Sequence, residues 1–112
     1  KVLKKELLIL KEKSNFEKFI FVVGIQKDKD IDKMLGTISL VASAIIFTKS
    51  GNPKAAEPLY LFKKFNQINK NKPIRIKMID NPKNALAYAK KIASKNDLIV
   101  ATGSIYMIGK II

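Results

Sequence analysis

The sequence predicts a three-layer, doubly wound α/β domain whose sheet is mainly parallel. Segments with the pattern of strands and segments with the pattern of helices alternate strictly along the chain, as they do in domains built from strand–helix–strand units. Most of the strand-like segments are continuous apolar runs, which is typical of strands buried on both faces. At 112 residues, with 47% hydrophobic residues, the chain has the size and composition for one core, so we expect residues 1–112 to form a single domain.

A helix over residues 1–14 and a strand over residues 19–24 are expected first. The leucines of the helical segment recur at helical spacing on one face, with lysines opposite. Because the chain begins inside this helix without a capping residue, we expect the first strand of the domain to be missing from it. The strand over residues 19–24 is aromatic and β-branched, and it ends at a glycine.

Asp30 is the candidate N-cap of the next helix, which we expect to run through about Ala42. The inner face of this helix is expected to carry Ile31, Leu35 and Ile38. Residues 44–48 form another short apolar run, which predicts a further short, buried strand. The chain then enters a loop rich in turn-forming residues.

Proline positions help to locate the next two helices. Pro58 suits the first position of a helix whose apolar face is formed by Leu61, Phe65 and Ile68. Residues 74–79 alternate apolar and polar side chains, which predicts a strand with one face in water at the edge of the sheet. Asn81 and Pro82 predict the start of a further helix. Its inner stripe is expected to comprise Leu86, Ala89, Ile92 and Ala93.

The last expected elements are a strand over residues 98–101, a tight turn and a final helix. Gly103 permits a sharp turn, and Ser104 is placed to cap a helix. A helix N-terminus at the carboxyl ends of parallel strands presents N–H donors to an anion. Thr102, Gly103 and Ser104 are therefore candidate anion-binding residues, although a turn without a binding role fits the same residues.

The composition excludes several kinds of chemistry. The chain has no cysteine, so it has no disulfide and no thiolate metal site, and a cytoplasmic location is expected. It also has no histidine, which removes the commonest general base. No apolar run approaches the roughly 18 residues that a membrane span requires, so we expect no membrane partner.

The formal net charge of +13 favours anionic partners. However, Arg75 is the only arginine, and bidentate recognition of phosphate favours arginine over lysine. The lysines occur in every segment of the chain. We therefore expect a solvated lysine surface and no nucleic-acid partner.

Few residues have catalytic potential. The chain has no glycine-rich phosphate-binding loop of the form G-x-x-x-x-G-K-[ST]. Asp28 and Asp30 are two residues apart, which is a weak signal for a metal site, and Asp30 is better explained as a helix cap. Lys29 and Lys54 follow strands and are candidates for contact with phosphate or carboxylate groups. We expect no catalytic residue and no metal ligand in this chain.

Three segments that follow predicted strands carry a resemblance to a known family. Residues 102–109 read T-G-S-I-Y-M-I-G, residues 24–30 have the form G-x-x-x-D-K-D, and residues 52–55 read N-P-K-A. In this order they resemble the C-terminal domain of the folylpolyglutamate synthase / dihydrofolate synthase family of the Mur ligase superfamily. In that family the first motif reads about T-G-S-L-Y-L-V-G and the last N-P-R-A, so Lys54 stands in place of arginine. The likeness covers nearly the whole chain.

The resemblance implies a Rossmann-like C-terminal domain of an ATP-dependent ligase. Such enzymes activate a carboxylate as an acyl phosphate and join it to L-glutamate, in folate biosynthesis and one-carbon metabolism. The acceptor would be dihydropteroate or a folate, and the sequence leaves the choice open. An upstream P-loop domain of the same enzyme would hold ATP and magnesium, so the isolated chain would bind no cofactor and be inactive.

The resemblance also assigns site residues by motif position. It places Thr102, Gly103 and Ser104 near the glutamate and phosphate side of the cleft. Five residues would form the rim that faces the nucleotide: Gly24, Asp28, Lys29, Asn52 and Lys54. The family's D-G-x-H-N-P motif would precede residue 1 and is not in this sequence, so no catalytic role is carried over.

Two other classes of function are alternatives to the ligase domain. A small basic α/β module that binds nucleic acid or another polyanion would lose affinity steeply with salt. A receiver-type signalling domain would need an acidic cluster with a phosphoacceptor aspartate at a strand end. The strands over residues 19–24 and 44–48 end in glycine and threonine instead, which fits that class poorly.

Overall fold

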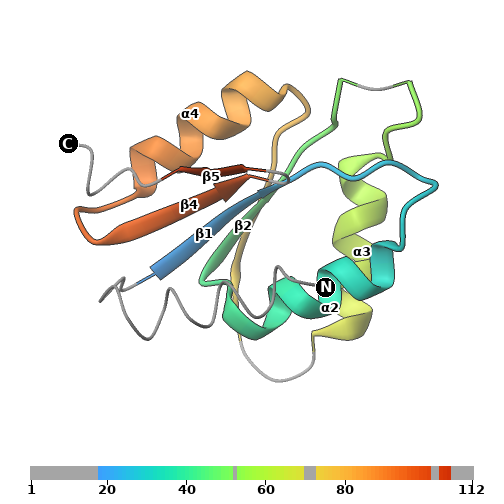
Figure 1. The fold of residues 1–112 in the computed structure, drawn as a ribbon, viewed down its shortest axis with the longest axis horizontal. Coiled ribbons are helices and arrows are strands. Elements are labelled where there is room, and N and C mark those ends of the chain that lie inside the picture. The colour runs from blue at the N-terminus through green and yellow to red at the C-terminus, as the bar shows by residue number, and fades with distance from the viewer. Residues whose placement is uncertain (1–17, 52, 70–72, 102–103, 107–112) are drawn as a thin grey trace.

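A five-stranded sheet forms the centre of the computed structural model, which describes residues 18–51, 53–69, 73–101 and 104–106 (Figure 1). The strands lie in the order β3-β2-β1-β4-β5. Their bounds are β1 Lys18–Val23, β2 Ala44–Phe47, β3 Arg75–Met78, β4 Asp97–Ala101 and β5 Ser104–Tyr106. The helices that connect them are α2 Ile31–Val41, α3 Pro58–Ile68 and α4 Pro82–Ile92.

The sheet is mainly parallel, which confirms the predicted fold class. Strands β3, β2, β1 and β4 pair in parallel, and β5 alone pairs antiparallel, with β4. Val23 at the end of β1 lies beside Phe47 at the end of β2, and Val22 lies beside Ala101 at the end of β4. The carboxyl ends of these three strands therefore meet at one edge of the sheet.

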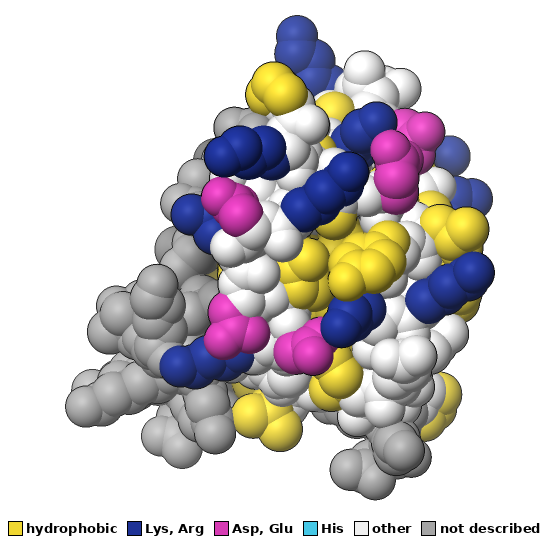
Figure 2. All heavy atoms as spheres, turned by 90° about the vertical axis from the view of Figure 1, so that its right-hand side faces the viewer, with side chains coloured by type: hydrophobic (Ala, Val, Ile, Leu, Met, Phe, Trp, Pro, Cys, Tyr) yellow, Lys and Arg dark blue, Asp and Glu magenta, His cyan; other side chains and the backbone are white. Residues whose placement is uncertain are grey.

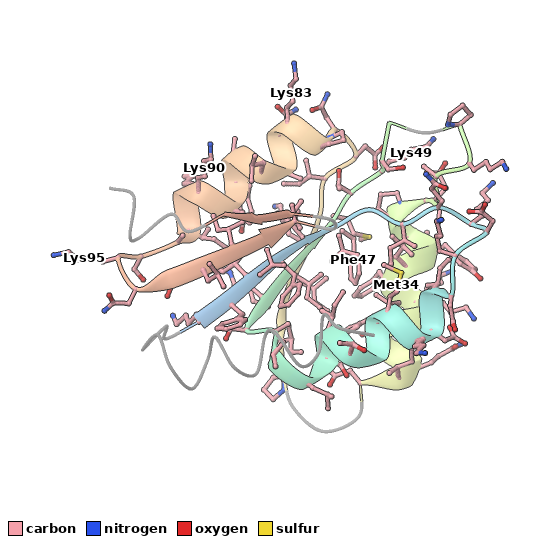
Figure 3. The ribbon with its side chains drawn as sticks, in the orientation of Figure 1. Met34, Phe47, Lys49, Lys83, Lys90 and Lys95 are labelled. Atoms are coloured by element: carbon pink, nitrogen blue, oxygen red, sulfur yellow. The ribbon has the colours of Figure 1, made fainter. Side chains whose placement is uncertain are left out.

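Helices cover both faces of the sheet and give it three layers (Figure 1). Helices α2 and α3 pack on one face over a core rich in aromatic residues, where the rings of Phe47 and Phe65 lie edge to face with centroids 5.9 Å apart. Figure 3 shows Phe47 and Met34 directed into this layer. Helix α4 packs on the other face, where Ala85 and Ala89 are fully buried. Their small side chains bring the helix close to the sheet.

The predicted caps and the predicted inner faces of α2 and α3 agree with the structure. The Asp30 carboxylate accepts a hydrogen bond from the Lys33 backbone N–H and caps α2, and Pro58 occupies the first turn of α3. In α4 the expected stripe is only partly correct. Ala89 is buried, and the other three residues of the predicted stripe are half-buried and pack against the core. The sequence prediction missed Ala85, which is fully buried.

Strand β3 lies at the edge of the sheet, as its alternating sequence predicted. Arg75 and Lys77 are exposed, while Ile76 packs partly against the α2–α3 core. Charged side chains on an edge strand hinder pairing with another chain. The helix expected over residues 1–14 lies outside the described residues. None of the helices that the structure describes has the length and apolar character needed to cross a membrane.

Replacing Gly36 with alanine should stabilise the protein. Gly36 lies inside α2, and a Cβ atom built there meets nothing within 4 Å. Glycine in a helix interior costs about 0.5–1 kcal/mol relative to alanine because its unfolded chain has more freedom. Urea unfolding should show Gly36→Ala more stable by about that amount, and a loss of stability would contradict the open environment of this position.

Candidate functional site

A cleft of about 360 Å³ opens at the carboxyl edge of the sheet. It lies where β1, β2 and β4 end and where α4 begins. Its lining comprises Val22, Gly24, Thr48, Ser50, Gly51, Pro82, Lys83, Leu86 and Ala101. Gly24 and Thr48, which follow β1 and β2, therefore lie together at this edge; Gly103 is outside the described residues.

The cleft lies at the point where the order in which the chain adds strands to the sheet reverses direction. From β1 the chain proceeds through β2 to β3 with its helices on one face, and then returns through α4 on the other face to β4, beside β1. In open α/β sheets, ligands bind outside the carboxyl ends of the strands at such a switch point. The position of the cleft therefore makes it the candidate ligand site.

Gly24 and Thr48 form a tightly packed wall of the cleft. A Cβ atom on Gly24 would lie 3.1 Å from the backbone nitrogen of Ser50 and 3.3 Å from Cγ2 of Thr48. Thr48 is buried, and its hydroxyl donates a hydrogen bond of 3.0 Å to the backbone carbonyl of Asp80. The ends of β1 and β2 and the start of α4 are thereby held in fixed positions, and only glycine fits at residue 24 without displacing them.

The N-terminus of α4 borders the cleft, but its donors are already engaged. The Asn81 side-chain oxygen accepts hydrogen bonds from the backbone N–H groups of Lys83, at 2.9 Å, and Asn84, at 3.1 Å. The helix end therefore does not offer these groups to an anion. Among the described residues that line the cleft, Lys83 is the one charged residue, and none is a carboxylate. Such a lining can bind part of a ligand through hydroxyl, backbone and ammonium groups.

The structure corrects the prediction for Ser104. Ser104 begins strand β5, which pairs antiparallel with β4 so that Ala101 lies opposite Ser104 and Val100 opposite Ile105. No helix begins there, so the argument from a helix N-terminus does not apply to this residue. The antiparallel pairing of β5 with β4 therefore replaces the expected helix start at Ser104. Thr102 and Gly103 lie outside the described residues.

The loops that carry the other motifs are joined by backbone hydrogen bonds. Lys27 donates to the carbonyl of Lys54 at 2.8 Å, and Ala56 donates to the carbonyl of Ile25 at 2.9 Å. The Lys54 ammonium lies 3.9 Å from the Asp28 carboxylate. The loop after β1 and the loop after β2 therefore form one unit beside the cleft. Of the five predicted rim residues, this unit contains Gly24, Asp28, Lys29 and Lys54, and Asn52 lies outside the described residues.

Charges of both signs alternate on the surface beside this loop unit. Figure 2 shows lysines and carboxylates interspersed around a few apolar side chains. Lys49 pairs with Glu57 at 2.8 Å, and Lys64 pairs with Asp32 at 3.0 Å. The hydrogen bond to Glu57, and then its charge, raises the pKa of Lys49 above its ordinary value. No group of three or more carboxylates capable of holding a metal ion occurs among the described residues.

Sequence reasoning missed two residues of the cleft lining, Ser50 and Lys83. It predicted the end of a strand at Thr48 but not the hydrogen bond of the Thr48 hydroxyl to Asp80. No sequence signal marks Lys83, because its place in the cleft depends on α4 packing on the opposite face of the sheet from α2 and α3. Tyr60 was also missed; it is 48% exposed and lines a cavity of about 220 Å³ together with Lys29 and Lys64.

Comparison with known proteins places this fold among ligase domains. Residues 3–105 match the family model described as Mur ligase, glutamate ligase domain. Among solved structures, E. coli FolC in complex with ADP has a TM-score of 0.74 and 18% identity, over 96% of this chain and 24% of that one. Mycobacterium tuberculosis folylpolyglutamate synthase complexed with ADP and AMPPCP has a TM-score of 0.74 and 22% identity, over 95% and 25%.

A third solved structure gives the same picture. Folylpolyglutamate synthase from Thermotoga maritima has a TM-score of 0.65 and 21% identity, over 95% of this chain and 23% of that one. At these identities the likeness shows a common fold. The chain spans about a quarter of the length of these three structures. None of the curated protein sequences matches it.

Proposed function

The chain belongs to the glutamate ligase domain family of the Mur ligases, and on this basis we propose that it is one domain of an ATP-dependent ligase that joins L-glutamate to a folate or to dihydropteroate. ATP would supply the phosphoryl group that activates the acceptor carboxylate as an acyl phosphate. The amino group of glutamate would then displace phosphate and form the amide. The family match over residues 3–105 is the observation that carries this proposal.

The chemistry of the cleft supports a role in binding. The described residues of its lining offer hydroxyl, backbone and lysine groups and include no carboxylate. Phosphoryl transfer needs a cradle for the phosphates and a metal ion that neutralises the developing charge. The described residues contain no group of three or more carboxylates, and an upstream P-loop domain of the same enzyme is proposed to hold the metal and most of the nucleotide. Residues 1–112 would form the α/β domain that completes the active site.

We assign the contacts of this domain in two groups. Gly24, Thr48 and Ser50 at the carboxyl edge would border the bound ligand. The rim formed by the loops after β1 and β2, with Asp28, Lys29, Asn52 and Lys54, would face the nucleotide. Thr102, Gly103 and Ser104 stay assigned to the glutamate side by their motif alone.

The full-length enzyme should release phosphate from ATP only when both glutamate and an acceptor are present. The test compares dihydropteroate, folate and buffer as acceptors, each with and without L-glutamate, and follows both phosphate and the ligated product. Dependence on glutamate with either acceptor supports the proposal, and the preferred acceptor identifies the reaction. Ligation of another amino acid in preference to glutamate would contradict it.

A further inference from the structure

The surface formed by β3 and α4 is basic and almost free of acids. It carries six cationic side chains, which together define the α4 face: Arg75, Lys77, Lys83, Lys90, Lys91 and Lys95. Over residues 73–101 the acids are Asp80, which is exposed, and Asp97, which is buried at 1% exposure. Helix α4 itself contains no acidic residue.

The remaining described acids lie on the opposite side of the molecule. Four carboxylates belong to the loop after β1, to α2 and to the residue before α3, and three of them pair with lysines: Asp28, Asp32 and Glu57. No side chain of the α4 face forms an ion pair with a described residue. Among the described residues, the α4 face is therefore a region of positive charge that no carboxylate pairs with.

The side chains of the α4 face are accessible and arranged along the helix. Figure 3 shows Lys83 and Lys90 extending from the same side of α4, away from the sheet, and Lys95 beyond its end. The exposed residue between Lys83 and Lys90 on this side is Ala87, which obstructs neither of them. Eleven residues of helix span about 16 Å. A linear anion could follow this row of lysines without meeting a bulky side chain.

The α4 face is continuous with the cleft, because Lys83 belongs to both. From that end α4 runs back along the sheet to Lys90 and Lys91 in its last turn. A ligand that is held in the cleft and lengthened step by step would thus have a basic path along α4. Each glutamate that is added to such a ligand contributes one further carboxylate.

We propose that the α4 face binds the oligoglutamate tail of the ligase's own substrate or product. This inference rests on the proposed function, since it requires an enzyme that adds glutamate. Lysine ammonium groups act as point charges that pair with single carboxylates. Nucleic acid fits the face less well, because five of the six cations are lysines and the half-buried Tyr88 ring already contacts Lys77, at 5.5 Å.

The test measures binding of fluorescein-labelled γ-linked pentaglutamate to the 112-residue chain by anisotropy. The double variant Lys90→Gln/Lys91→Gln lies outside the cleft lining and removes two charges from the α4 face. It should weaken binding roughly two- to thirtyfold, since an exposed charge pair contributes about 1.4- to fivefold in affinity. The control Lys33→Gln/Lys63→Gln removes the same charge from exposed positions on α2 and α3, and it should change binding less than twofold.

Competition separates the possible ligands. Unlabelled pentaglutamate should displace the probe at far lower concentration than single glutamate, and added salt should weaken binding. Equal losses in the two double variants, or equal competition by single glutamate, would overturn the inference. Tighter binding of a single-stranded oligonucleotide of equal charge would also overturn it. Thermal unfolding verifies that both variants are folded. The ligase assay is separate, so failure of the tail site leaves the proposed reaction independently testable.

Discussion

Replacing Phe65 with alanine is expected to lower the free energy of unfolding by about 3–5 kcal/mol. Phe65 is fully buried in the layer between the sheet and helices α2 and α3, with its ring against Phe47. Truncation removes a large apolar surface from this layer and leaves a cavity that the neighbouring aromatic residues cannot fill. Because a domain of this size is stable by only about 5–15 kcal/mol, much of the molecule would unfold at moderate temperature.

The neighbouring substitution Asn66→Ala provides the control for Phe65→Ala. Asn66 lies on the exposed side of the same helix, so its replacement should change stability by less than about 0.5 kcal/mol. Urea unfolding followed by circular dichroism measures both variants. Similar midpoints for Phe65→Ala and Asn66→Ala would show that this aromatic layer does not stabilise the fold.

Replacing Gly24 with alanine should reduce ligation by the full-length enzyme by about three- to tenfold. The added Cβ atom meets the Ser50 backbone and the Thr48 side chain, so these groups must move by a few tenths of an ångström. A shift of about 1 Å in groups that position a substrate can cost on the order of a hundredfold in rate, so this smaller shift should cost less. The strain itself should cost about 1–3 kcal/mol of stability, which leaves the enzyme folded.

Gly51 offers a matched control in the same cleft. It also lines the cleft, but a Cβ atom there meets nothing within 4 Å. Gly51→Ala should therefore keep kcat/KM for glutamate close to the parent value. If Gly24→Ala retains full activity while its unfolding midpoint falls, the tight wall at Gly24 is structural and the cleft is not the binding site.

Local signals account for what the sequence predicted correctly. Asp30 and Asn81 mark the starts of α2 and α4 through hydrogen bonds within three residues, and Pro58 marks the start of α3. The alternation in residues 74–79 identified the edge strand, because only one face of it packs against the core. These features depend on residues near in sequence, so pattern and capping rules suffice for them.

The incorrect predictions concern features that are determined by contacts between residues far apart in the sequence. Ser104 is a good helix cap by its local sequence, yet the neighbouring edge of β4 accepts β5 as a pairing strand. Ala85 lies four residues before Ala89 on the same side of α4, but alanine is a weak apolar signal, and its burial follows from the close packing of α4 on the sheet. The cleft combines β1, β2, β4 and α4, and its lining follows from a strand order that one sequence does not determine.

The central claim is that this chain supplies one side of a ligase active site and does not catalyse ligation alone. The most direct measurement is glutamate-dependent phosphate release from ATP, with folate or dihydropteroate present. It is made for the 112-residue chain, for the separately expressed upstream domain and for their mixture. We predict no turnover by either part and recovery of glutamate-dependent turnover on mixing, because positioning two reactants requires both sides of the cleft. Glutamate-dependent turnover by the chain alone would contradict this account.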